Sequence, residues 1–438
     1  MSSSFGHSLR AFLRRPAGPG AYVRRSERLC GGNRIDLLVG GEATYAAMLA
    51  AVASAERSVH LTTYILHSDA TGERFAAALA ERAAARDGAL DVRLMFDAVG
   101  SFETVSDEFL MRLVEAGVKV HIYHPILPAR RRLQERLQQL HARYELARGR
   151  TPRSPSPFSP DFWGFHRRNH QKILVVDDRV AFTGGINIGD EYVDRDVGGH
   201  AVRGWHDLHV RVEGPAAVEL GNAFRGAWNR SGAVPMRGSA RADCVHTPVT
   251  LEVCANVEWD ATKGRFRNVR RTSMRTAYLH AIQAARASVS IANAYFLPDA
   301  DLRRALCQAA QRGVRVQVIV PKDSDVRIVY HASRYVYDEL LVAGVEIHEF
   351  VGPMMHAKAA VIDGEWATVG SFNLDHRSFR HNLEAGVQVL DRDFAATLAA
   401  QFERDLASSE RVELVAWRKR SWHARLREEL SHLFAWWL

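Results

Sequence analysis

The chain has 438 residues, of which 47% are hydrophobic, and its formal net charge is +8. A chain of this size can bury a substantial core and is expected to form two domains. No uninterrupted apolar stretch approaches the roughly 18 residues that span a bilayer, so we expect no transmembrane segment. The four cysteines, at positions 30, 244, 254 and 307, lack the paired spacing of a metal site. Reduced thiols of a cytosolic compartment are therefore expected.

The positive charge favours an anionic partner, which is either nucleic acid or an anionic lipid surface. The alternative is that the charge serves solubility alone. Residues 1–30 are rich in Arg, Ser and Gly and contain no apolar segment of a secretory signal. We interpret them as a flexible basic arm, with a transit peptide as the alternative.

Helical and extended patterns alternate through the first predicted domain, which comprises residues 31–229. Helices are expected at 43–55, 73–86 and near 108–116, and strands at 58–64, 90–96 and 118–123.

A basic insertion, residues 126–165, interrupts this first domain. Leu133, Leu137 and Leu140 recur at helical spacing among many arginines, and Phe162, Trp163 and Phe165 follow a Ser/Pro tract. A basic amphipathic helix beside aromatic residues is typical of a membrane-surface element. A solvated helical flap over the active-site cleft is the alternative.

The same order of elements returns after a predicted linker at residues 230–250, which is rich in Arg, Gly and Pro. In the second domain, residues 251–410, helices are expected at 277–287, 301–312 and 337–343. Strands are expected at 288–295, 314–320 and 345–350. Residues 58–69 align without gaps on 288–299. The repeat predicts a duplicated α/β fold, in which each domain has a mixed, largely parallel sheet flanked by helices.

Residues 411–438 form a tail that differs in amino-acid composition from both domains. It combines Trp417, Trp422 and further Trp, Leu and Phe residues with five basic residues between 418 and 427. Trp and basic residues together are enriched at bilayer interfaces, so we interpret the tail as an interfacial anchor. Packing of the tail on the protein or on a partner is the alternative.

One short motif, H-x-K-x4-D followed by Gly-x-x-Asn, occurs twice with the same spacing. The first copy comprises His170, Lys172, Asp177, Gly184 and Asn187. The second copy comprises His356, Lys358, Asp363, Gly370 and Asn373. A single histidine of this kind is more often a core or surface residue, but two copies in register indicate function. Because the copies lie in different halves, one active site at the interface of the two domains is expected.

The apolar run after each lysine ends in Asp-Asp or Asp-Gly and is followed by a second apolar run, which predicts a β-hairpin. Residues two apart on a strand share a face, so each His should point the same way as its Lys. Asp177 and Asp363 belong to the catalytic motif, but we interpret them as structural residues that bind turn backbone.

Two sets of His, Lys and Asn suit phosphodiester chemistry. Lys supplies a cation and Asn an amide donor for anionic oxygens, while His can be nucleophile, acid or base. One His would attack phosphorus and the other, protonated, would give its proton to the leaving alkoxide. Asp207 and Glu384, downstream of the two motifs, are candidates for carboxylates that orient the two histidines.

The duplicated motif resembles that of the phospholipase D superfamily. The chain is similar to bacterial cardiolipin synthases of the shorter type without N-terminal membrane spans, over roughly residues 30–410. Further similarity lies at residues 31–33 with Leu37 and Leu38, at 63–65 and at 211–215. One departure is Gly185, where the second copy has Ser371.

The resemblance implies a phosphohistidine intermediate and no metal or other cofactor. It also implies that the substrate phosphate is bound by Lys172, Asn187, Lys358 and Asn373. An acidic residue behind the catalytic His is implied as well, and Glu384 and Asp207 fit that place. By analogy we assign His170 as nucleophile and His356 as acid and base, and the reverse assignment stays open.

The resulting hypothesis is a cardiolipin synthase that transfers a phosphatidyl group from one phosphatidylglycerol to another and releases glycerol. The alternatives are a phospholipase D that hydrolyses phospholipids, a phosphodiesterase or nuclease, and a non-enzymatic lipid-binding scaffold. The expected partners are phospholipids, phosphatidylglycerol or phosphatidylethanolamine, and an anionic membrane surface, with no nucleic acid. The expected location is peripheral, on the cytoplasmic side of a bacterial cell membrane.

Overall fold

The structure is a computed structural model. It describes residues 21–23, 29–85, 89–125, 127–152, 167–231, 233–236, 250–255, 257–260, 265–268 and 274–435. Most of the predicted arm and linker, and the three aromatic residues of the insertion at 162–165, lie outside these ranges.

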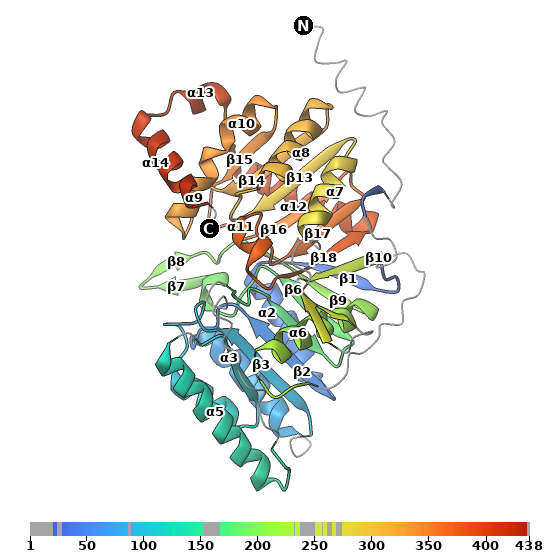
Figure 1. The fold of residues 1–438 in the computed structure, drawn as a ribbon, viewed down its shortest axis with the longest axis vertical. Helices are drawn as coiled ribbons and strands as arrows, with labels where there is room; N and C mark the ends of the chain where they lie inside the picture. The colour runs from blue at the N-terminus through green and yellow to red at the C-terminus, as the bar shows by residue number, and fades with distance from the viewer. Residues whose placement is uncertain are drawn as a thin grey trace.

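The first half of the chain forms a seven-stranded sheet with helices on both faces (Figure 1). Its elements are β1 (Arg34–Val39), α2 (Gly40–Ala53), β2 (Ser58–Thr63), α3 (Ala70–Ala84), β3 (Asp91–Asp97), α4 (Asp107–Glu115), β4 (Lys119–Tyr123), α5 (Pro128–Ala147), β5 (Ile173–Val176), β6 (Val180–Gly184), the short 3-10 helix η5 (Asp190–Tyr192), the hairpin β7 (Arg195–Val197) and β8 (His200–Val202), β9 (Leu208–Glu213) and α6 (Pro215–Arg230).

The second half repeats this plan around an eight-stranded sheet. Its elements are β10 (Thr250–Ala255), the pair β11 (Val257–Asp260) and β12 (Arg265–Asn268), α7 (Met274–Ala284), β13 (Ser288–Asn293), α8 (Ala300–Gln311), β14 (Arg315–Pro321), α9 (Arg327–Tyr335), α10 (Tyr337–Val342), β15 (Glu346–Phe350), β16 (Lys358–Ile362), β17 (Trp366–Gly370), α11 (His376–Arg380), β18 (Ala385–Leu390), α12 (Arg392–Ala407), β19 (Ser409–Arg411), α13 (Leu414–Arg418) and α14 (Trp422–Leu433).

The two sheets have the same strand order, β1-β9-β6-β5-β2-β3-β4 in the first and β10-β18-β17-β16-β13-β14-β15 in the second, where β19 is added at the edge. β5 and β9, like β16 and β18, run opposite to the other strands of this shared core. Most strands therefore run in one direction, which confirms the mixed α/β duplication. Within the described part of the two sheets, parallel strand pairs occur in β2-β3-β4 and β13-β14-β15, and the other neighbouring strands pair antiparallel.

Each motif forms the predicted hairpin, β5–β6 in the first half and β16–β17 in the second. Three residues separate the last paired residues of each hairpin, 177–179 in the first and 363–365 in the second. The φ angles are positive at Asp177 and Asp178 and at Asp363 and Gly364. β5 alternates strictly between two cores, with Leu174 and Val176 in one and Ile173 and Val175 in the other.

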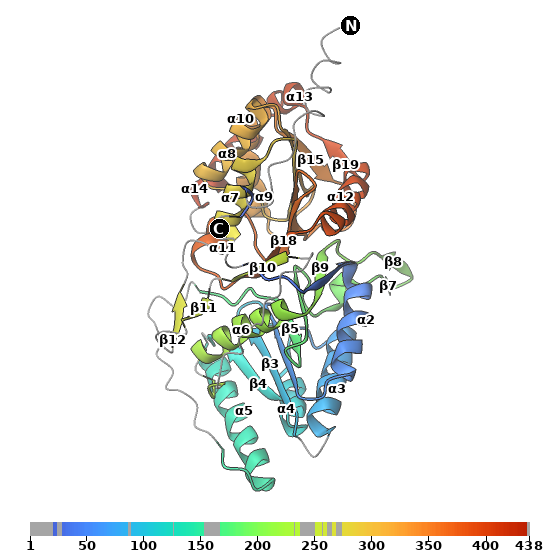
Figure 2. The same ribbon diagram turned by 90° about the vertical axis from the view of Figure 1, so that its right-hand side faces the viewer.

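Helices cover both faces of each sheet (Figure 2), with α2 and α3 opposite α6 in the first half and α7, α8 and α10 opposite α12 in the second. A third apolar core is shared by the two halves, because β6 and β9 pack against β17 and β18. The domain boundaries at 229–251 stay a proposal; α6 ends at Arg230 and β10 begins at Thr250.

Two expectations need correction. The apolar side of α5 is not free for a membrane, because Leu133 and Leu137 are buried in the core against α4 and β4. Cys30 is disulfide-bonded, whereas Cys254 and Cys307 are free thiols. None of the described helices combines the length and apolarity of a membrane span.

Candidate active site

The segment before each motif strand is pinned by backbone hydrogen bonds to the opposite half. The N–H of His170 donates to the carbonyl of Leu383 (2.9 Å), and the N–H of His356 donates to the carbonyl of His206 (2.7 Å). Each bridge places the motif histidine beside the residue that follows its backbone partner. These residues are Glu384 and Asp207.

Each histidine therefore meets a carboxylate from the other half. His170 Nδ1 lies 2.9 Å from Glu384 Oε2, and His356 Nδ1 lies 2.8 Å from Asp207 Oδ2. All four side chains are buried. With Nδ1 as the donor, the Nε2 atom of each imidazole is left for chemistry. The structure thus places each predicted carboxylate beside a motif histidine, and each motif histidine takes its carboxylate from the opposite half.

The departure at Gly185 has a geometric cause. A Cβ atom at this position would lie 2.2 Å from Asp207 Oδ1, so the first half has no room for a side chain there. In the second half the longer Glu384 stands off from the backbone, and Ser371 donates its hydroxyl to that carboxylate. Gly with Asp and Ser with Glu are therefore two alternative ways to fill the same space.

The motif lysines lie next to their histidines, as the spacing predicts. Lys172 Nζ donates to the carbonyl of His170 (2.9 Å), and the equivalent bond joins Lys358 to His356. The ring of Tyr64 lies 4.8 Å from that of His170 and 5.3 Å from Lys172 Nζ. In the second copy, His356 and Lys358 both face the ring of Tyr295 (6.1 and 6.0 Å).

Further aromatic side chains surround His356. The rings of Trp205 and Tyr192 lie 5.7 and 6.2 Å from its imidazole, and the Tyr192 hydroxyl is 3.4 Å from Nδ1. Among these aromatic neighbours, Tyr192 and Tyr295 carried no signal in the sequence. Tyr192 comes from the short helix η5, and Tyr295 comes from the chain just after β13. The strand pattern does not predict which side chain either residue points at.

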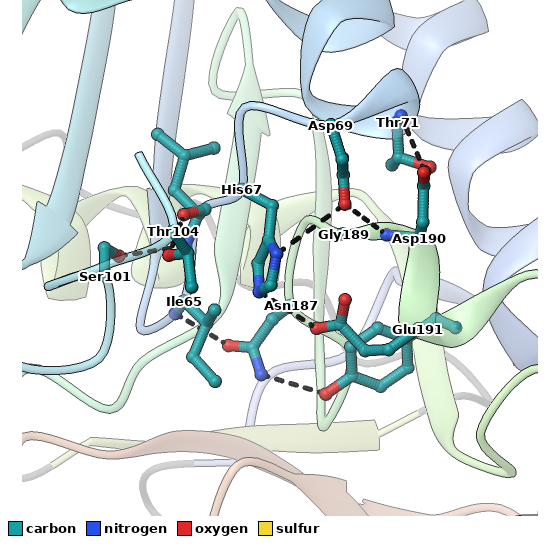
Figure 3. A network of polar contacts seen from close by, with 12 residues as sticks. Ile65, His67, Asp69, Thr71, Ser101, Thr104, Asn187, Gly189, Asp190 and Glu191 are labelled. Atoms are coloured by element: carbon teal, nitrogen blue, oxygen red, sulfur yellow. Dashed lines mark hydrogen bonds and ion pairs between the residues drawn. The ribbon is translucent and has the colours of Figure 1, made fainter. Parts of the chain in front are cut away.

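Asn187 is held in a polar network at the first motif (Figure 3). Its Oδ1 accepts from the N–H of Ile65 (3.1 Å), and its Nδ2 donates to the hydroxyl of Tyr192 (2.9 Å). Asn373 is also buried, but its Oδ1 has no partner among the described residues. The two asparagines are therefore not equivalent, because both ends of the Asn187 amide make hydrogen bonds whereas the amide oxygen of Asn373 makes none within the described residues.

The same network contains His67, Asp69 and Glu191, whose ligand atoms lie within 4.8 Å of one another (Figure 3). His67 turns Nδ1 to Asp69 (3.7 Å) and Nε2 to Glu191 (3.8 Å). A metal would need one nitrogen to converge with both carboxylates. Asp69 also accepts the N–H groups of Gly72 and Asp190. The group fits a loop support better than a cation site.

The motif aspartates bind backbone, but not that of their own hairpin turns. Asp177 accepts the N–H groups of residues 56–58, before β2. Asp363 accepts those of residues 286–288, before β13. Each carboxylate therefore ties the motif hairpin to the neighbouring strand of its own sheet.

Burial shapes the charges of the site. It lowers the pKa of Lys172 to about 7 and that of Lys358 to about 8. Burial, reinforced by both lysines, holds the pKa of His170 well below its ordinary value. Burial and Lys358 also lower the pKa of His356, while Asp207 opposes that shift.

The pKa values of the two carboxylates are shifted in opposite directions. Burial raises the pKa of Glu384 to about 7, although Lys172 opposes the shift. Burial alone would raise the pKa of Asp207 too, but Lys358 and His356 hold it below its ordinary value. An ionised Asp207 favours the imidazolium form of His356, so the two histidines sit in unlike environments.

The sequence and the fold of this chain are similar to those of known proteins. A family model for the phospholipase D-like domain of cardiolipin synthase matches residues 48–198 and 278–406. The chain belongs to this phospholipase D-like family.

Its relatives include cardiolipin synthases. The probable cardiolipin synthase YwiE of Bacillus subtilis is 32% identical over 408 residues, which cover 92% of this chain and 72% of YwiE. A cardiolipin synthase of Geobacillus kaustophilus is 31% identical over 411 residues, which cover 91% and 71%.

Among solved structures, phosphatidylserine synthase of Haemophilus influenzae Rd KW20 superposes with a TM-score of 0.64 at 12% identity. The match covers 94% of this chain and 96% of that one. At this identity the likeness shows a shared fold.

Proposed function

We propose that the protein is a cardiolipin synthase that transfers a phosphatidyl group between two phosphatidylglycerol molecules. The observation that carries the proposal is the pair of buried histidines, each backed by a carboxylate of the opposite half and each next to a buried lysine. Such a set supplies a nucleophile, an acid and two cations for one phosphodiester. The cardiolipin synthases among the relatives support the choice of lipid.

In the first step, Nε2 of His170 attacks phosphorus of the donor lipid. The bond from phosphorus to the glycerol oxygen breaks, and His356 gives its Nε2 proton to the departing glycerol. The strongly lowered pKa of His170 keeps this imidazole neutral, as a nucleophile must be. Burial and Lys358 lower the pKa of His356, and the ionised Asp207 opposes that shift and so supports the protonated form that an acid requires.

In the second step, His356 takes the proton of the acceptor's terminal hydroxyl. That oxygen attacks phosphorus, the phosphorus–nitrogen bond to His170 breaks, and cardiolipin leaves. Lys172 and Lys358 would bind the equatorial phosphate oxygens, together with Asn373 and the remaining N–H of Asn187. Both histidines are buried, and exclusion of water from the intermediate would favour transfer over hydrolysis.

We also propose peripheral binding to an anionic membrane through α14. This helix packs on α9, with Glu428 buried in ion pairs with Arg334 and Arg420. Its other face exposes a helical stripe of Trp422 (65%), Leu426, Leu430, Leu433 (72%) and Phe434. Exposed Lys419, Arg425 and Arg427 lie beside this apolar stripe. An apolar stripe flanked by basic residues fits an anionic lipid surface.

The cytoplasmic side of a bacterial membrane remains our proposal for the location. The Cys30 disulfide counts against it, since disulfides persist in oxidising compartments. The proposal requires that protease added to intact spheroplasts leaves the protein undigested, and that the protease digests it once the spheroplasts are lysed.

The test of the function is to incubate the protein with phosphatidylglycerol vesicles in the absence of metal and to follow lipids and glycerol by mass spectrometry. Cardiolipin with an equal amount of glycerol is the expected result. Phosphatidic acid as the sole product would make the protein a phospholipase D. No lipid turnover, with DNA cleaved by wild type but not by the double His170→Ala/His356→Ala variant, would make it a nuclease.

A further inference from the structure

A pocket of about 320 Å³ lies beside His356 at the junction of the two halves. Its walls come from the chain after β14, the chain after β15 and Trp205 of the first half. Trp205 links it to the site, since its ring lies 5.7 Å from that of His356. Tyr295 makes a second link, because it faces His356 at 6.1 Å and donates its hydroxyl to Asp325 of the pocket (2.8 Å).

The corresponding place in the first half is built differently. Two positions before the motif histidine, the first copy has Arg168 and the second has Met354. At the ends of the corresponding strands β3 and β14 stand Asp97 and Pro321. Arg168 and Asp97 form an ion pair (3.5 Å) with side chains only 1% and 0% exposed. The uncharged pair Pro321 and Met354 instead lines an open pocket.

The lining suits a small polyhydric alcohol. Asp323 and Asp325 offer carboxylate oxygens to hydroxyl donors, and Ser324 offers a hydroxyl that can donate or accept. Trp205 and Phe350 provide apolar walls for a carbon chain. The volume lies near the lower end of the roughly 300–1,000 Å³ typical of ligand sites, so it fits a headgroup rather than acyl chains. The single cation, Lys322, is paired with Glu410 (2.7 Å).

We propose that this pocket is the alcohol subsite, which holds the glycerol that leaves the donor lipid and then the glycerol headgroup of the acceptor lipid. The inference rests on the proposed function, in which His356 protonates the leaving alcohol and deprotonates the attacking one. Both alcohols must then pass beside His356, in line with and opposite to His170. Asp325 is the residue that selects a polyol over a simple alcohol or water.

The experiment is a competition between acceptors. Wild type and variants are given unlabelled phosphatidylglycerol vesicles as phosphatidyl donor, with isotopically labelled glycerol and ethanol at equal concentration. The ratio of labelled phosphatidylglycerol to phosphatidylethanol is measured by mass spectrometry. The variants are Asp325→Asn, which removes the charge, and Met354→Arg, which introduces the residue of the first half into the pocket. Asp107→Asn, an exposed carboxylate on α4, is the control.

Wild type and the control should prefer glycerol. Both pocket variants should lower the glycerol-to-ethanol ratio. Asp325→Asn should lower it about tenfold, the effect of losing one hydrogen bond to a charged group, and Met354→Arg should lower it by filling the pocket. An unchanged ratio in both variants would overturn the subsite, even though the enzyme transfers phosphatidyl groups. Preference of wild type for ethanolamine over glycerol, in a parallel competition, would overturn the choice of a polyol. Failure of wild type to consume any phospholipid, phosphatidylglycerol included, would overturn the proposed function itself.

Discussion

At the scale of single residues, the site depends on pairs that are far apart in the chain. His170 and Glu384 are 214 positions apart, and His356 and Asp207 are 149 apart. The duplicated motif predicts which histidines and lysines act together. It does not predict which carboxylate meets which histidine, because that depends on the backbone bridges between the halves. The sequence also does not predict which aromatic side chains lie beside His356, because their positions depend on how the two halves pack together.

The lysine environments predict how activity depends on pH. Both lysines have pKa values lowered by burial, to about 7 for Lys172 and about 8 for Lys358, so each is charged below its pKa and neutral above it. The value of kcat/KM with phosphatidylglycerol should therefore fall as pH rises from about 7 to 9. The fall in kcat should occur at a higher pH than the fall in kcat/KM, because a bound phosphate anion raises the pKa of the lysines and keeps them charged. A kcat/KM profile that is flat across this range would show that the lysine charges are not needed.

At the scale of elements, strands and helices with a regular pattern are predicted well from the sequence. The six strands and six helices expected from the repeat are all present, with ends shifted by a few residues. The strands β1, β9, β10 and β18 and the helices α6, α9 and α12 are not predicted. The edge and returning strands lack a repeat signal of their own. The two basic amphipathic helices differ in what covers their apolar side. The apolar side of α5 is buried in the core, whereas α14 has an exposed apolar stripe. Periodicity alone does not show which neighbour covers an apolar face.

The exposed stripe of α14 predicts a specific effect on membrane binding. Leu433→Glu places a charge in the most exposed position of the stripe and should weaken binding to phosphatidylglycerol vesicles at least about tenfold, since burial of a Leu side chain contributes about 1.5–3 kcal/mol. Vesicle co-sedimentation measures this. Ala396→Glu adds the same charge to the exposed face of α12 and should bind like wild type. Equal binding of Leu433→Glu and wild type would remove α14 from the membrane contact.

At the scale of the whole molecule, duplication has produced two halves with the same strand order but unequal sites. The shared core of β6, β9, β17 and β18 holds the halves together, and the bridges at Leu383 and His206 run from this junction to the motif histidines. The asymmetry between Gly185 with Asp207 and Ser371 with Glu384 gives the two histidines different environments. A pseudo-symmetric scaffold can in this way supply one nucleophile and one acid.

The measurement that tests this account most directly is the position of the covalent intermediate. The protein is mixed with phosphatidylglycerol, quenched within one turnover and analysed by peptide mass spectrometry. One phosphatidyl group on the peptide that contains His170 is the predicted adduct. It should be absent from His170→Ala and should still form in His356→Ala, in which turnover falls by about 10²–10⁴-fold through loss of the acid and base. An adduct on His356 would reverse the two roles, and turnover without any adduct would contradict the phosphohistidine mechanism.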